Sequence, residues 1–193
     1  MKLLKNLLAL IGMLLPFALV LMLWLIFQGE NLDRLKAGVV DVPGGRDLLA
    51  EAESALEGGR SFEIDEVELN AHIGRVLQAR EGDGFEIFAE FEGLWVRLLE
   101  GAFELVIERD VLGVESTVAV RVDVIPAEGG HGFRVTGGRF GRLPVPAGAM
   151  YLVRGGLRNI AAVFEPEKGV LSQVGAVTIS PGRLRLERSS GRF

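Results

Sequence analysis

Hydrophobic positions dominate the first thirty residues of the chain. No formal charge occurs from Asn6 to Gly29, and a helix needs roughly 20 apolar residues to cross the ~30 Å hydrocarbon core of a bilayer. Lysines precede this run and acidic residues follow it, which places the N-terminus in the cytoplasm by the positive-inside bias. We therefore expect residues 1–29 to form a retained single-pass transmembrane anchor in the cell membrane. The rest of the chain would be extracytoplasmic, and periplasmic if the envelope has two membranes.

Helical periodicity returns after a polar stretch. Residues 30–45 mix polar side chains with the sequence VPGG, which is typical of a linker, and we expect one domain over residues 46–193. The stretch 47–56 has helix-forming composition and is stopped by two glycines. A second helix is predicted from Asp65, because Glu68 follows at the spacing of a capping box and apolar residues then recur every three or four positions.

The middle of the chain changes to a period of two. From residue 85 to residue 124, apolar side chains alternate with polar ones in successive segments, as in Val118, Val120, Val122 and Val124. This alternation predicts strands with one buried face. The connections between the segments are short, and short connections join antiparallel strands.

Beyond Gly141 the apolar spacing lengthens again. Residues 150–164 carry apolar side chains at steps of three and four, which predicts an amphipathic helix, and VGAVTIS and RLRLE then read as two closing strands. The expected fold class is α+β. After the transmembrane helix, one curved antiparallel sheet would carry about three helices packed on one of its faces.

Charge is distributed unevenly along the chain. The formal net charge is −5 and there is no cysteine, so disulfides are excluded and a nucleic-acid partner is not expected. Residues 30–130 contain 9 basic and 23 acidic side chains, whereas residues 131–193 contain 10 basic and 3 acidic ones. Two explanations stay open: the two regions neutralise each other as cross-strand pairs, or the basic region faces anionic lipid or another acidic partner.

Catalytic and cofactor motifs are not recognisable in the sequence. The stretch GGRFGRLPVP lacks the lysine of a phosphate-binding loop, and its prolines remove amide donors that an anion would need. His72 and His131 show no metal-ligand spacing, and no serine lies in a nucleophile-elbow sequence. Glutamates at every second position are typical of a solvated sheet face. We therefore expect no enzyme activity, no cofactor, no metal and no bound nucleotide.

Short motifs give the chain a resemblance to one protein family. Glu68-Leu69-Asn70 at the start of a helix and Gly141 to Pro146 before another helix are similar to features of the YpmS-like family of bacterial membrane-anchored proteins. The resemblance implies an extracytoplasmic domain without established catalytic residues. A curved sheet closed by helices also resembles, in architecture alone, lipid-carrying proteins of the TULIP type.

Two functions are compatible with these features. The first is a membrane-tethered, non-enzymatic domain that binds a lipid-like or apolar ligand between the sheet and its helices. Its expected ligand-binding residues are the apolar Leu157, Ile160 and Phe164, which can equally be plain core, and, toward anionic headgroups, Arg139, Arg142, Arg154 and Arg158. The second is a protein–protein interaction or scaffold module of the cell envelope, with the acidic strands as the binding face.

Overall fold

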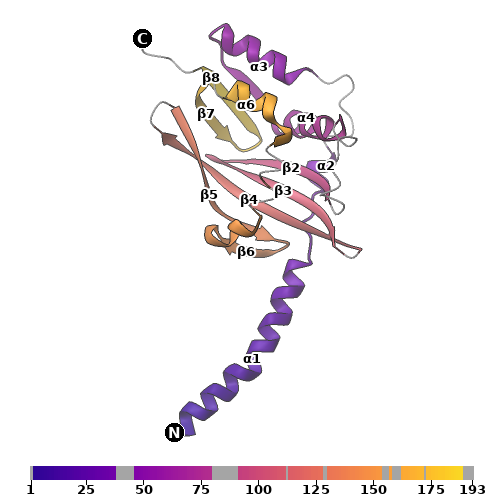
Figure 1. Cartoon of the computed structure of the whole chain (residues 1–193), viewed down its shortest axis with the longest axis vertical. Helices are drawn as coiled ribbons and strands as arrows, with labels where there is room; N and C mark the ends of the chain where they lie inside the picture. Colours follow the sequence, from indigo (N-terminus) through magenta and orange to yellow (C-terminus); the bar gives the residue numbers. More distant parts are fainter. Residues whose placement is uncertain are drawn as a thin grey trace.

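The structure is a computed structural model that describes residues 2–37, 46–79, 91–111, 113–127, 130–153, 157, 162–171 and 173–188. It is an α+β fold in which two antiparallel sheets lie against each other and a long N-terminal helix extends away from them (Figure 1). The antiparallel strands follow the predicted alternation. The division into two sheets was not predicted.

Five strands form the larger sheet, in the order β2-β3-β4-β5-β6. Each strand pairs antiparallel with its neighbour in sequence, so the sheet is a meander. The strands are β2 (Phe91–Leu99), β3 (Ala102–Val111), β4 (Val114–Ala127), β5 (Gly130–Phe140) and β6 (Leu143–Pro146).

Three strands form the smaller sheet, in the order β1-β8-β7. They are β1 (Phe62–Asp65), β7 (Val174–Ser180) and β8 (Arg183–Arg188). Turns of each sheet bond to the other sheet: the Gly101 amide donates to the Ile179 carbonyl at 3.0 Å, and the Gly182 amide donates to the Leu98 carbonyl at 3.2 Å. These bonds fix the two sheets together at one end.

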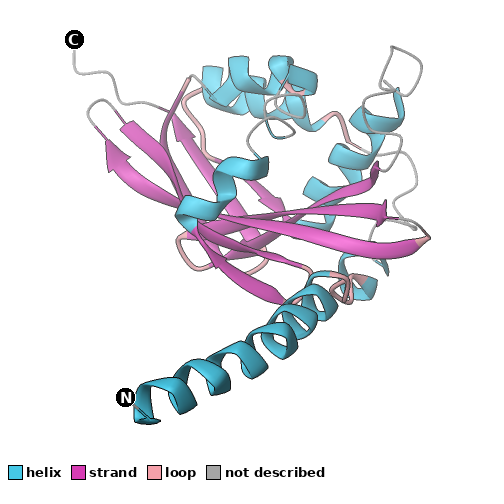
Figure 2. Cartoon of the chain, turned by 60° about the horizontal axis from the view of Figure 1, so that its bottom comes forward, coloured by secondary structure: helices cyan, strands magenta, loops and turns pink. Residues whose placement is uncertain are grey.

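The helices lie on both sides of the larger sheet (Figure 2). On one side, together with the smaller sheet, are α3 (Leu48–Glu57), α4 (Glu66–Ala79) and α6 (Glu165–Leu171). On the other side are α1 (Lys2–Ile26) and the short α2 (Asp33–Ala37). A 3-10 helix, η2 (Ala147–Val153), follows β6.

Two side chains of helix α4 form hydrogen bonds with the backbone at the outer edge of β2. Asn70 is 1% exposed; its amide nitrogen donates to the Val96 carbonyl at 2.8 Å, and its amide oxygen accepts from the Val96 amide at 2.6 Å. The Glu66 carboxylate accepts from the Leu98 amide at 2.6 Å. The helix thus satisfies backbone groups that a neighbouring strand would otherwise bond. Its own start is capped by Asp65, which accepts from the Glu68 amide at 2.8 Å.

Three apolar clusters make up the described core. The main cluster joins the inward face of the larger sheet to α4 and β7. The second packs α3 against the smaller sheet and α6. The third lies on the opposite face of the larger sheet, where Leu32 and Leu35 cover Val106 and Ala119. Both faces of the larger sheet are therefore buried over part of their area.

The transmembrane helix expected in residues 1–29 was a wrong prediction. Across the described part of the chain, no helix combines the length and the apolar character needed to cross a membrane. The apolar run was counted to Gly29, whereas α1 ends at Ile26 and its last turn bonds to the domain. The Leu25 carbonyl accepts from the Arg142 amide at 2.9 Å, and the Ile26 carbonyl accepts from the Ser116 hydroxyl at 3.1 Å.

Gly141 makes this docking of α1 possible. Its φ is +54°, and a Cβ atom at this position would lie 2.4 Å from the Ile26 carbonyl oxygen and 2.5 Å from that of Leu25. Only glycine combines this backbone conformation with such a close approach. Within the glycine-rich stretch before β6, Gly141 therefore serves the contact between α1 and the sheet.

Other predicted boundaries also changed. The range expected as a linker, 30–45, contributes α2 and the buried Leu32 and Leu35 to the fold, because these leucines cover an apolar patch of the larger sheet. Helices cover two faces instead of the expected one. Of the helix predicted over residues 150–164, the structure describes η2, which ends at Val153, and α-helical conformation at Leu157, Ala162 and Val163. Most of the other residues in this range lie outside the described part, and α6 starts after it, at Glu165.

Candidate apolar ligand site

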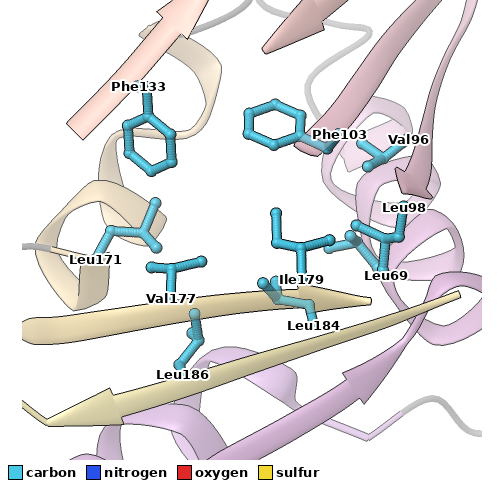
Figure 3. Close-up of a pocket in the computed structure, with 10 residues that line it drawn as sticks. All are labelled: Leu69, Val96, Leu98, Phe103, Phe133, Leu171, Val177, Ile179, Leu184 and Leu186. Carbon is cyan, nitrogen blue, oxygen red and sulfur yellow. The ribbon is translucent and has the colours of Figure 1, made fainter. Parts of the chain in front are cut away.

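An apolar cavity of about 160 Å³ lies between the two sheets (Figure 3). The larger sheet and the smaller sheet each turn side chains into it, and α4 and α6 contribute one side chain each. The lining consists only of apolar side chains: Leu69, Val96, Leu98, Phe103, Phe133, Leu171, Val177, Ile179, Leu184 and Leu186.

The strand period explains why these side chains meet. Residues two apart on a strand point to the same face, so Val96 and Leu98 line the cavity from one sheet while Val177 and Ile179 line it from the other. The hydrogen bonds from Gly101 to Ile179 and from Gly182 to Leu98 hold the two sheets together at one end of the cavity. Between the facing layers the side chains leave a space instead of interlocking completely.

A second cavity of about 170 Å³ adjoins the first. It lies among α3, α4, α6 and the smaller sheet, and four leucines line both cavities: Leu69, Leu171, Leu184 and Leu186. The other lining residues are Leu48, Leu49, Ala52, Phe62, Ile64, His72, Glu167 and Val170. The two apolar spaces are therefore neighbours that share part of their lining.

Large apolar side chains at the rim of the first cavity are exposed. Phe133 is 51% exposed and Leu171 is 36% exposed, although both belong to the cavity lining. The Phe133 ring meets the rings of Phe103 and His131 edge to face, with centroids 6.0 Å and 5.2 Å away. An exposed phenylalanine beside an apolar cavity is typical of an entrance to a binding site.

One hydrogen-bonded pair supplies the polar groups of the second cavity. His72 on α4 and Glu167 on α6 approach to 3.0 Å between Nε2 and Oε1, and because a carboxylate only accepts, His72 donates. The other carboxylate oxygen of Glu167, Oε2, is buried and has no hydrogen-bond partner among the described residues.

The two predicted arginines that the structure describes, Arg139 and Arg142, do not line the cavity. Arg139 points to the opposite face of the larger sheet, where its guanidinium pairs with Glu30 at 3.0 Å and Glu104 at 2.8 Å. The Arg142 side chain is exposed on the turn after β5. Arg154 and Arg158 lie outside the described residues.

The predicted apolar residues are partly accounted for by the core. Leu157 and Phe164 are half-buried and pack against the main cluster, and neither lines the cavities described above. The plain-core interpretation therefore applies to these two. Ile160 lies outside the described residues.

Ion pairs occupy the opposite face of the larger sheet. Glu104 and Glu108 were expected on a solvated face, yet they are 8% and 5% exposed. Arg97 donates to Glu104 at 2.9 Å, and Lys36 of α2 pairs with Glu108. This hydrogen bond to Glu108 raises the pKa of Lys36. The pairing of Arg139 with Glu30 and Glu104 is an instance of neutralisation between the basic and acidic regions.

Within the ranges that the structure describes, no group of three or more histidine, aspartate or glutamate side chains could hold a metal ion. No family model and no curated protein matches the chain. The resemblance to the YpmS-like family therefore stays a prediction. The candidate site is inferred only from the arrangement of its residues.

The prediction from sequence missed most of the residues that line the cavities. A usable signal is present in β5, where His131, Phe133 and Val135 recur with a period of two in a region that otherwise looks like a turn. Leu69 was assigned to an apolar helix face, but periodicity does not indicate whether such a face meets a solid core or a cavity.

Proposed function

We propose that this protein binds a small apolar ligand, a ring or a single hydrocarbon chain, in the cavity between its two sheets and in the second cavity that adjoins it. The observation that supports the proposal most strongly is the continuous apolar lining beside the exposed Phe133 and Leu171. Binding sites for apolar molecules are typically concave, mostly apolar and preformed.

The volumes limit the size of the ligand. Each space is close to an apolar cavity of about 150 Å³, which stays dry and takes up benzene, and both are below the roughly 300–1,000 Å³ of a site for a drug-sized molecule. A two-chain lipid does not fit such spaces. A single chain or a ring with a short tail fits, with one end in each cavity.

Filling the first cavity is worth a measurable amount of free energy. At about 24 cal/mol per Å³ of empty volume, a space of about 160 Å³ corresponds to roughly 4 kcal/mol, an upper value because its rim is open to solvent. A gain of about 4 kcal/mol corresponds to a Kd near 1 mM. Transfer of the ligand's own apolar surface out of water adds to this, and the lost translational and rotational freedom of the ligand subtracts from it, so we expect a Kd between about 1 mM and the micromolar range.

A dye titration tests the proposal on the purified full chain. N-phenyl-1-naphthylamine is neutral and fluoresces strongly in apolar surroundings, and we expect saturable binding. Val177→Phe places extra volume in the cavity and is expected to weaken binding at least tenfold. Val67→Phe is the matched control, because Val67 is 40% exposed on α4 and lines neither cavity. Equal dye binding by both variants and the unmodified chain would rule out the site.

A protein–protein interaction module of the cell envelope is the second candidate. It is supported by α1, whose large apolar side chains from Met13 to Trp24 are 47–69% exposed, more apolar surface than a monomeric protein normally leaves uncovered. A photoreactive amino acid at Met13 would crosslink to one defined protein in the native cell, and the same group at Glu53 would not. No discrete product from Met13 would exclude this function.

A further inference from the structure

The second cavity is apolar except at one place in its wall. His72 on α4 and Glu167 on α6 meet there as a hydrogen-bonded pair, with side chains that are 16% and 22% exposed. All other residues of its lining are leucine, isoleucine, valine, alanine or phenylalanine. A ligand that enters this cavity has one polar feature to recognise.

The hydrogen-bonding capacity of Glu167 is only partly used. A carboxylate accepts hydrogen bonds on both oxygens, and His72 occupies Oε1. The buried Oε2 has no partner among the described residues. A buried acceptor without a donor destabilises the protein. This oxygen is therefore suited to accept a hydrogen bond from a donor group of a ligand.

We propose that the ligand of this site ends in a hydrogen-bond donor, a hydroxyl or an ammonium group, which binds Glu167 Oε2 while the apolar body fills the leucine-lined spaces. This inference rests on the proposed function. His72 contributes by holding the carboxylate through Oε1, which leaves Oε2 for the ligand. A fatty acid is disfavoured, because its carboxylate brings acceptors and a second negative charge to the same place.

The test compares three probes that share an eight-carbon chain and differ in the end group. 1-Octanol, octylamine and octanoate are titrated against the dye bound to the full chain at pH 7.5. We expect octanol and octylamine to displace the dye at concentrations at least tenfold lower than octanoate. Because an ionised carboxylate also stays in water more readily, the comparison is repeated with a variant of the acceptor.

Glu167→Gln replaces one carboxylate oxygen, which accepts hydrogen bonds, with an amide NH2 group, which donates them. The gap between octylamine and octanoate is then expected to shrink to less than threefold. Glu53→Gln removes an exposed carboxylate of α3 that lines neither cavity and is expected to keep the full gap. Circular dichroism during heating checks that both variants are folded, and the three probes on the unmodified chain test the inference even if Glu167→Gln does not fold.

The outcomes separate this inference from the proposed function. Dye binding with displacement by all three probes at concentrations within threefold of one another would overturn the donor preference and leave the apolar site standing. An unchanged gap in a folded Glu167→Gln variant would also overturn it. A chain that binds no dye would refute the proposed function, and the donor preference with it.

Discussion

Replacing Asn70 with leucine removes the polar contact between α4 and the edge of the larger sheet. Leucine has the same number and branching of side-chain heavy atoms and suits a helix, so the change tests hydrogen bonding more than side-chain shape. The side chain of Asn70 is 1% exposed and bonds both the amide and the carbonyl of Val96. Its amide nitrogen also donates to the Glu66 carbonyl at 2.8 Å.

The size of the effect follows from what the substitution leaves behind. Val96 is 6% exposed, so its freed amide and carbonyl groups cannot recover their bonds from bulk water. A buried backbone group without a partner costs about 1–3 kcal/mol, so two such groups give about 2–6 kcal/mol. Domains of this size typically unfold with about 5–15 kcal/mol, so a loss of this size is a large fraction of the stability.

Urea unfolding of the full chain, followed by tryptophan fluorescence, measures this loss. Gln78→Leu is the control, because Gln78 is exposed on the same helix, and it is expected to change the free energy of unfolding by less than about 0.5 kcal/mol. A loss below about 1 kcal/mol for Asn70→Leu would refute the idea that this side chain satisfies the strand edge.

Three further predictions concern the opposite face of the larger sheet. Lys36 has a raised pKa because it hydrogen-bonds Glu108, so its stabilising contribution is fully present below its unfolded-state pKa of about 10.4 and is lost as the pH rises through the higher folded value. The difference in unfolding free energy between the unmodified chain and Lys36→Met should therefore be constant from about pH 7 to 10 and decline above that; a difference that declines already near neutral pH would contradict this. Glu104→Gln weakens the pairing of two partly buried arginines and should cost about 1–3 kcal/mol by urea unfolding, whereas the exposed Glu100→Gln should cost little. Gly141→Ala should raise amide hydrogen exchange across residues 28–36 by displacing the end of α1, whereas Gly182→Ala, with positive φ but nothing within 4 Å of its Cβ, should not.

Local patterns in the sequence predicted individual elements well where a local cause determines them. Asp65 starts α4 because its carboxylate caps the helix, and the valines of β4 share a face because strands have a period of two. The pairing of β1 with β8 could not be predicted from the sequence. It joins Phe62 to Leu186, and a short apolar segment does not reveal which distant strand it meets.

The candidate site was harder to predict than the fold. Its residues come from nine strands and helices far apart in the chain, and a cavity arises from imperfect packing between them, which composition does not encode. Arg139 was expected at a ligand headgroup because basic residues cluster near the C-terminus. It turned instead to Glu30 and Glu104, because the strand alternation places it on the other face.

Helix α4 covers one edge of the larger sheet, and β6 forms the other edge with Pro144 and Pro146 in its four residues. Prolines cannot donate to an added strand, and a covered edge offers few groups to an incoming one. Both sides are thus protected against the edge-to-edge pairing that starts fibrous aggregation. Variants that expose the edge of β2, such as Asn70→Leu, can therefore affect the solubility of the protein as well as its stability.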